Sequence, residues 1–288
     1  MAVLRALFIS LSESQTLRGI AERSAIGQRF SGRFVAGTQV EDVLRATQAV
    51  NQAGLTVSID NLGENVTNAD EARASAALYH QLLDEIAARK LQANISLKLT
   101  HMGLDVDEKL ATDQVTCLVK KAAGMSPPNF VRVDMEGSPY TQRTLDFVHQ
   151  LHRIPGNRGC VGAVIQSYMR RSESDIEKLL SEGIRIRLCK GAYKEPPEIA
   201  FQKKNEVDDN YIKLMKILMK SDVYHGLATH DEQIIREAQA FATRENIARD
   251  QRRSLSFIVE EALVEFVQRQ GKNVPSNPRK DHRSRATE

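Results

Sequence analysis

Short apolar segments alternate with amphipathic helical patterns along most of the chain, and this alternation limits the fold more than any other feature. Each apolar segment is about six residues long, a length typical of buried strands rather than of helices. The predicted strands cover residues 55–60, 94–99, 130–135, 161–166, 184–189 and 224–229. The predicted helices follow from about residue 70 and near 107–123, 140–152, 173–182, 205–220 and 231–246, with a leading helix at about 39–53. Ser172, with Asp175 three residues later, is predicted to cap the helix at 173–182.

Six consecutive βα units predict an α/β fold with a parallel sheet, either a barrel or a doubly wound sheet. The chain has 288 residues, enough for one large α/β domain or two smaller domains. No Gly-x-Gly-x-x-Gly segment follows the first predicted strand. Its absence weakens the case for a dinucleotide-binding fold.

Composition gives little indication of a nucleic-acid or membrane partner. The net charge of +3 is too small to indicate nucleic-acid binding by itself. No apolar stretch approaches the ~20 residues of a membrane span, and the N-terminus lacks the apolar run of a signal peptide. The three cysteines, Cys117, Cys160 and Cys189, form no Cys-x-x-Cys pair or zinc-type spacing. We therefore expect a reduced, cytoplasmic setting.

Polar residues collect on one face of the predicted strands, near their C-terminal ends. Alternate side chains of a barrel strand point inward, and the C-terminal mouth of a (βα)₈ barrel is where active sites lie. The polar residues that share the inward parity are Asp60, Lys98, Asp134, Gln166, Arg187 and His230. A buried ion network would account for any one of them. Six at one mouth favour a ligand site, because buried charge is costly unless it is paired or serves a ligand.

The charges near this mouth suit an anionic ligand. Lys98, Arg187 and Lys190 are positive, and Gly191 permits a close approach of the backbone. A carboxylate, a phosphate or a cofactor with a pyrophosphate fits such donors. His101 and His230 are isolated from other ligand-type residues in the sequence, so no metal site is predicted.

Six segments around the strand ends carry a resemblance to a known family. They are SIDNLGE (58–64), ISLKLT (95–100), VRVDMEGS (131–138), VIQSYMRRS (164–172), IRLCKGAYKEP (186–196) and LATHD (227–231). In this order and at these intervals they resemble the bacterial monofunctional proline dehydrogenases. Members of that family are flavoenzymes that oxidise L-proline to 1-pyrroline-5-carboxylate, the first step of proline degradation. The resemblance covers residues 1 to about 248, and it implies a distorted (βα)₈ barrel with FAD at the C-terminal mouth.

The resemblance also implies roles for individual residues. Asp134 and Arg187 match catalytic positions, Lys98 matches the contact to the substrate carboxylate, and Tyr193 matches a residue that shapes the pocket. The implied FAD contacts are Met135, Gln166, Arg187, Lys190, Gly191, Ala192, Thr229 and His230. These roles agree with the chemistry of the side chains. A fixed guanidinium stabilises negative charge on a reduced flavin, and a lysine supplies a point charge for a carboxylate.

The C-terminal part departs from the family pattern. The family carries a Tyr-x-x-Arg-Arg segment whose arginines hold the proline carboxylate, and this chain has none: Arg170-Arg171 belong to the fourth-strand motif, and Arg252-Arg253 lack the tyrosine. Losing these arginines is expected to weaken substrate binding by about 1.5–3 kcal/mol per hydrogen bond. We therefore expect an incomplete barrel-like domain over 1–248. A divergent or truncated C-terminus follows at 249–288, helical at 254–270 and then basic and disordered.

The resemblance implies L-proline as substrate, a quinone as electron acceptor and peripheral association with the inner face of the membrane; no nucleic acid is expected. Two alternative functions stay open at this point. One is a Schiff-base lyase or aldolase that uses Lys98 or Lys190. The other is a non-catalytic, incomplete barrel whose basic tail binds a partner or DNA, since Leu255, Phe257 and Val259 alternate as in a ribbon-helix-helix unit.

Overall fold

The computed structural model describes residues 36, 39–61, 66–245 and 247, and its strands form one six-stranded sheet. The strands are β1 (Val57–Asp60), β2 (Ala93–Leu97), β3 (Val131–Val133), β4 (Val161–Gln166), β5 (Arg185–Cys189) and β6 (Gly226–Leu227). Helix α4 (Val40–Gln52) precedes β1. The helices after the strands are α5 (Ala69–Ala88), α6 (Glu108–Ala123), α7 (Ser138–Arg153), α8 (Ser172–Ser181), α9 (Lys204–Met219) and α10 (Glu232–Arg244). The predicted tail at 249–288 lies outside the described residues.

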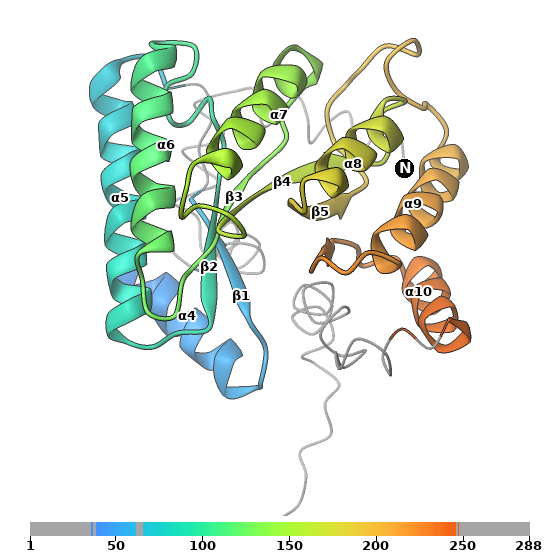
Figure 1. Ribbon diagram of the computed structural model, residues 1–288, viewed down its shortest axis with the longest axis horizontal. Helices are drawn as coiled ribbons and strands as arrows, with labels where there is room; N and C mark the ends of the chain where they lie inside the picture. The colour runs from blue at the N-terminus through green and yellow to red at the C-terminus, as the bar shows by residue number, and fades with distance from the viewer. Residues whose placement is uncertain (1–35, 37–38, 62–65, 246, 248–288) are drawn as a thin grey trace, which may run out of the picture.

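Every described strand pairs in parallel with the next strand along the chain, so the spatial order is β1-β2-β3-β4-β5-β6. This order confirms the six predicted βα units and the incomplete (βα)₈ barrel. Figure 1 shows α5 and α6, then α7 and α8, and then α9 and α10 following one another around the sheet. Within the described part of the chain, β1 and β6 are the edges of this half-barrel.

The predicted elements agree closely with the structure, with differences at their ends. Strand β4 matches its predicted range, whereas the predicted strand at 224–229 is a strand only at Gly226–Leu227. The predicted cap at Ser172 is wrong. Arg171 occupies the N-cap position of α8, and Ser172 is the first helical residue. The Ser172 hydroxyl donates instead to the carbonyl of Gln166, 2.5 Å away, because that carbonyl at the end of β4 lies within its reach.

The two faces of the sheet differ in character, as the parity argument predicts. On β5, Ile186 and Leu188 are buried against the helices, whereas Arg185, Arg187 and Cys189 on the other face are only half-buried. On the inner face, the strands β4 and β5 pack closely at Gly162. A Cβ built on Gly162 would lie 2.3 Å from the carbonyl oxygen of Arg185, so only glycine fits there. The inner face is therefore closely packed around Gly162 on β4, and Arg185 and Arg187 place charge at both ends of β5 on this face.

Helix starts are set by local polar residues. Asn68 and Asp107 accept hydrogen bonds from backbone N–H groups in the first turns of α5 and α6, and Asp231 does so for α10.

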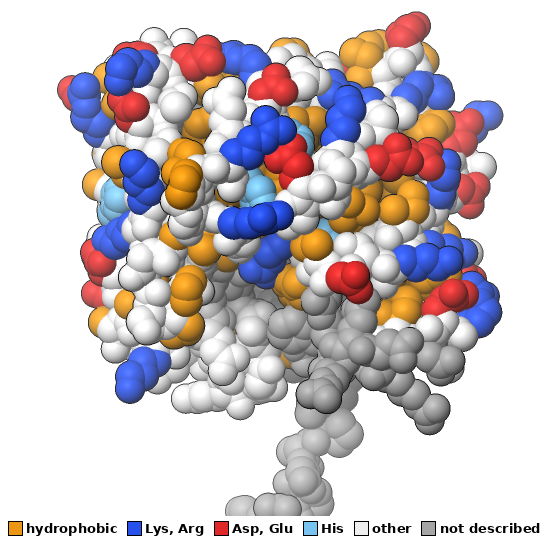
Figure 2. All heavy atoms as spheres, viewed as in Figure 1, with side chains coloured by type: hydrophobic (Ala, Val, Ile, Leu, Met, Phe, Trp, Pro, Cys, Tyr) orange, Lys and Arg blue, Asp and Glu red, His pale blue; other side chains and the backbone are white. Residues whose placement is uncertain are grey.

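Figure 2 shows positive and negative side chains intermingled over the face that is turned toward the viewer in Figure 1. No helix among the described residues is long and apolar enough to cross a membrane.

Candidate active site

An ion pair between Arg187 and Asp134 forms the centre of the candidate site. Nη2 of Arg187 lies 2.5 Å from Oδ1 of Asp134, and the Ser96 hydroxyl donates to the same oxygen over 2.6 Å. Asp134 directly follows β3, and Arg187 lies on β5. Strand β4 lies between them and pairs Val164 with Arg187, so the guanidinium reaches Asp134 across β4. The two side chains are 21% and 12% exposed, so the pair is largely desolvated but still open to a ligand.

Lys98 and Asp60 form a second, looser pair beside the first. Nζ of Lys98 lies 3.9 Å from Oδ2 of Asp60. The Tyr79 hydroxyl, from α5, donates to the carbonyl of Ser96 over 2.8 Å and lies 3.3 Å from Oδ1 of Asp60. Burial, together with the negative charge of Asp134, raises the pKa of Asp60 to about 6. The structure thus brings Asp60, Lys98, Asp134 and Arg187 together, as their shared parity predicts.

The end of β4 contributes an amide network. Gln166 is buried, and its Nε2 donates to the carbonyl of Glu136 over 3.0 Å. The carboxylate of Glu136 in turn accepts from the hydroxyl and the backbone N–H of Thr100, at 2.6 and 3.1 Å. Met135, between Asp134 and Glu136, is also buried. These bonds fix the segments that leave β2, β3 and β4 relative to one another.

Lys190 lies at the same mouth but is engaged by carboxylates. Its Nζ lies 2.6 Å from Asp208 of α9 and 2.8 Å from Asp231, the N-cap of α10. Lys204 contacts the same two carboxylates. The hydrogen bond from Lys190 lowers the pKa of Asp231 to about 2. Two cations thus face two anions in this cluster, and Lys190 ties the end of β5 to both following helices.

The remaining predicted residues lie around this cluster. Gly191 has a φ of +101°, and a Cβ there would lie 2.3 Å from the Tyr168 ring, so that ring requires glycine at 191 whether or not a ligand approaches. Ala192 is exposed and Tyr193 is half-buried. The Thr229 hydroxyl accepts a hydrogen bond from the backbone N–H of Asp231 over 3.1 Å, and His230 is exposed.

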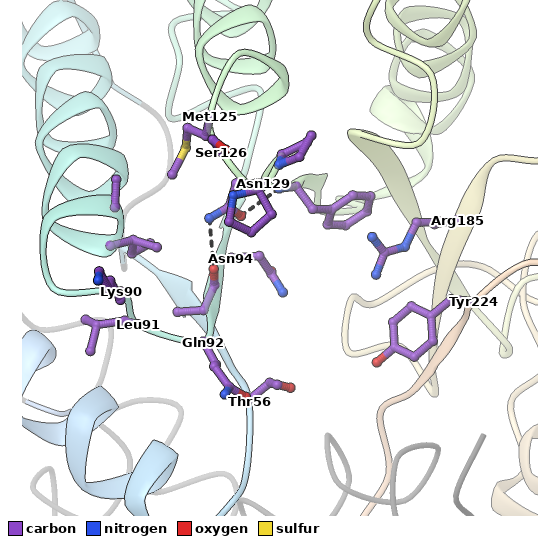
Figure 3. A pocket seen from close by; sticks show the side chains of 16 residues that line it. Thr56, Lys90, Leu91, Gln92, Asn94, Met125, Ser126, Asn129, Arg185 and Tyr224 are labelled. Carbon is purple, nitrogen blue, oxygen red and sulfur yellow. Dashed lines mark hydrogen bonds between the residues drawn. The ribbon is translucent and has the colours of Figure 1, made fainter. Parts of the chain in front are cut away.

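A cavity of about 870 Å³ lies at the opposite mouth. Figure 3 shows Arg185 and Tyr224 on one side of it and Asn94 and Asn129 on the other. Arg185 stacks on Phe130 and Tyr224, with its guanidinium carbon 4.1 and 4.6 Å from the ring centroids. The residues around this cavity lie at the N-terminal ends of the strands and include none of the predicted site residues. The C-terminal mouth is therefore the better candidate.

Comparison with known proteins identifies the family. The family model described as "Proline dehydrogenase" matches residues 43–271, past the boundary that we expect at 248. The chain belongs to the proline dehydrogenase family. It is 33% identical to proline dehydrogenase 2 of Bacillus subtilis (strain 168) over 248 residues, which cover 86% of this chain and 80% of the relative. It is 35% identical to proline dehydrogenase 1 of the same strain over 234 residues, 81% of this chain and 75% of that relative.

Solved structures show the same fold. One is proline utilization A (PutA) from Bdellovibrio bacteriovorus inactivated by N-propargylglycine, with a TM-score of 0.69 and 23% identity over 77% of this chain and 28% of that one. Another is PutA from Corynebacterium freiburgense, with a TM-score of 0.68 and 20% identity over 82% of this chain and 28% of that one. At 23% and 20% identity, the likeness to these two structures shows the fold of the chain and nothing further.

The donor set of this family member fits a flavin at the C-terminal mouth. Arg187 keeps 21% of its side chain exposed and Lys98 keeps 15%, so two cations reach the surface of the inner face. Such groups suit a ring system that gains negative charge on reduction. Gly191 adds no open cradle, because the Tyr168 ring already occupies the space beside it. Among the described residues, no group of His, Cys, Asp or Glu is arranged to hold a metal ion.

Three residues that contribute contacts around the site are not predicted from the sequence. Ser96 lies on the inward parity of β2 and was detectable as a polar neighbour of Lys98, but it carries no charge to draw attention. Tyr79 belongs to the buried stripe of α5, where its periodicity indicates only core packing. Glu195 contacts Ser138, 57 residues away, and nothing local in the sequence indicates this contact.

Proposed function

We propose that this proline dehydrogenase family member oxidises L-proline to 1-pyrroline-5-carboxylate with FAD as its cofactor. The observation that supports the proposal is the desolvated Arg187–Asp134 pair with Lys98 beside it, in a chain of this family. The reaction removes a hydride from Cδ, the ring carbon next to nitrogen that does not bear the carboxylate, and a proton from the nitrogen, which leaves a C=N double bond. FAD, when bound, supplies the acceptor for the hydride.

The residues of the chain have separate tasks in this proposal. Lys98 attracts the proline carboxylate. Asp60 holds the ammonium group of Lys98 in place, with its Oδ2 3.9 Å from Nζ. Arg187 presents a fixed positive charge where negative charge develops, and Asp134 holds the guanidinium in its orientation over 2.5 Å. Since both pairs are partly desolvated, their charges act more strongly than they would in water.

We assign the remaining residues on the strength of the family resemblance. Tyr193 shapes the proline pocket, and the flavin contacts are Met135, Gln166, Arg187, Lys190, Gly191, Ala192, Thr229 and His230. The structure gives Lys190 a further task, because its contacts with Asp208 and Asp231 tie β5 to α9 and α10. We also propose a quinone as the electron acceptor, with peripheral association at the inner face of the membrane.

The Schiff-base alternative has less support. Lys190 is engaged by two carboxylates, and Lys98 lies beside one. A lysine that forms a Schiff base must instead lose its proton in an apolar or cationic setting. The DNA-binding alternative rests on residues 249–288, which lie outside the described residues.

An absorption spectrum tests the proposed function directly. Purified protein incubated with FAD and separated from the excess is expected to keep a flavin spectrum, and anaerobic L-proline is expected to bleach it. Glycine, which lacks the ring, is the control and should leave the spectrum unchanged. Protein that stays colourless after incubation with FAD, or a flavin that proline does not bleach, would contradict the proposal.

A further inference from the structure

The connection between β5 and α9, residues 190–203, carries a carboxylate that the proposed reaction does not use. Oε1 of Glu195 accepts a hydrogen bond from the backbone N–H of Ser138 over 2.6 Å, and Oε2 accepts from the Ser138 hydroxyl, also over 2.6 Å. Ser138 is the first residue of α7. The carboxylate therefore lies at the positive end of a helix dipole and makes two charge-assisted hydrogen bonds.

This contact joins the two segments that hold the central ion pair. Asp134 lies four residues before Ser138, and Arg187 lies eight residues before Glu195. The later part of the connection is fixed separately to the β4–α8 segment. Arg170 N–H donates to the carbonyl of Ile199 over 2.9 Å, and Phe201 N–H donates to that of Tyr168 over 2.8 Å. Glu195 links the earlier part, which follows Gly191, to α7, and Tyr193 in that part also packs against Tyr168, Met169 and Ala200.

Tyr193 lies in this earlier part, against the segment after β3. A Cβ built on Gly137 would lie 3.9 Å from Cδ1 of Tyr193 and 3.4 Å from Oε1 of Glu195. The ring and the carboxylate thus lie against the same glycine. Gly137 is the N-cap of α7 and has no side-chain oxygen, so Glu195 does for this helix what Asn68 does for α5.

We infer that Glu195 is a positioning residue that fixes Tyr193 at the mouth of the half-barrel through Ser138. This inference rests on the proposed function for its kinetic consequence, since Tyr193 is the residue proposed to shape the proline pocket. Without the carboxylate, residues 191–195 lose their attachment to α7 and keep only the packing of Tyr193 against Tyr168, Met169 and Ala200, so the wall of the pocket is less ordered before substrate binds. The cost then falls on substrate binding more than on the chemical step.

Glu195→Ala, Glu195→Gln and Ser138→Ala test the inference in the full chain, with Glu198→Ala as the matched control because Glu198 is exposed on the same connection. Glu195→Ala is expected to raise KM for proline about tenfold, the scale of one hydrogen bond to a charged group, with a smaller change in kcat. Glu195→Gln keeps one oxygen acceptor, and Ser138→Ala keeps the backbone N–H donor. Each is therefore expected to raise KM for proline less than Glu195→Ala does. Glu198→Ala should leave KM unchanged.

Hydrogen exchange followed by mass spectrometry supplies a second readout that needs no activity. Glu195→Ala should speed amide exchange in residues 190–199 and leave exchange in β2 and β4 as in the parent chain. The Glu195→Ala/Ser138→Ala double variant should resemble Glu195→Ala alone, because both substitutions remove the same contact. Unchanged exchange in 190–199, or fully additive effects in the double variant, would overturn the inference. Faster exchange in a chain that does not oxidise proline would refute the proposed function and leave the anchoring role intact.

Discussion

Arg185 and Arg187 project from the same face of β5, yet they meet opposite kinds of partner. Arg187 faces a carboxylate 2.5 Å away at the C-terminal mouth, whereas Arg185 lies over the rings of Phe130 and Tyr224 at the N-terminal mouth. A guanidinium can do both, because it is a planar cation that forms ion pairs through the N–H groups along its edge and stacks on aromatic rings through its face. Position along the strand therefore separates an arginine in an ion pair, for which we propose a role in the reaction, from one that stacks on aromatic rings.

The largest expected effect in this comparison is that of Arg187→Lys. Lysine keeps the charge but not the planar fork, so kcat for proline oxidation should fall about 100-fold to 1,000-fold, as when one stabilising donor is lost. Steady-state kinetics with an artificial electron acceptor would measure the loss. Lysine is preferred to alanine because alanine would leave the Asp134 carboxylate without its cation in a largely desolvated place. A kcat equal to that of the parent chain would remove Arg187 from the proposed mechanism.

Arg185→Met should affect stability and spare catalysis. Methionine fills space between the rings of Phe130 and Tyr224 but loses the cation–π contacts, which contribute about 0.5–2 kcal/mol. Urea unfolding should therefore show a lower free energy of unfolding, while kcat and KM for proline stay as in the parent chain. A large fall in kcat with unchanged unfolding would show that the two ends of β5 are not divided as we describe.

The smallest expected effect concerns Asp60, the carboxylate that faces Lys98, Asp134, Arg187 and Tyr79. Its pKa rises from 3.8 to about 6, so the folded chain binds this proton more tightly than the unfolded chain. The contribution of Asp60 to the free energy of unfolding should therefore decrease as the pH rises from about 4 to about 6. Since the side chain is 30% exposed, we expect a change on the order of 1 kcal/mol after solvent screening.

Asp60→Asn isolates this contribution. Urea unfolding of both chains between pH 4 and 8 should show that the variant gains stability relative to the parent as the pH rises, with the gain complete above about pH 6. Parallel pH profiles for the two chains would contradict the raised pKa. The variant should also bind proline less well, because Lys98 loses the carboxylate that orients it.

The alternation of apolar and helical segments predicts the architecture because each βα unit is defined locally. A strand and its helix are specified by periodicity over short windows, and parallel neighbours follow from the alternation itself. Parity then places Asp60, Lys98, Asp134 and Arg187 together, and the structure confirms that juxtaposition. The assigned roles of these residues stay predictions.

Other contacts could not be predicted, because they join residues far apart in the sequence through loop geometry. Lys190 matches a cofactor position by motif, but its ion pairs with Asp208 and Asp231 depend on where α9 and α10 begin. The Tyr168 ring that requires glycine at 191 comes from a different loop. Ser172 satisfies the local rule for a helix cap, yet the nearby carbonyl of Gln166 takes its hydroxyl.

The strand order β1 to β6 also has a consequence for how the chain is made. Since each described strand pairs with the strand before it in the sequence, no pairing within this sheet has to wait for a distant segment. A nascent chain leaving the ribosome can add one βα unit at a time to a template that already exists, so each pairing needs only the unit made before it. Assembly of the described half-barrel is therefore compatible with the direction of synthesis.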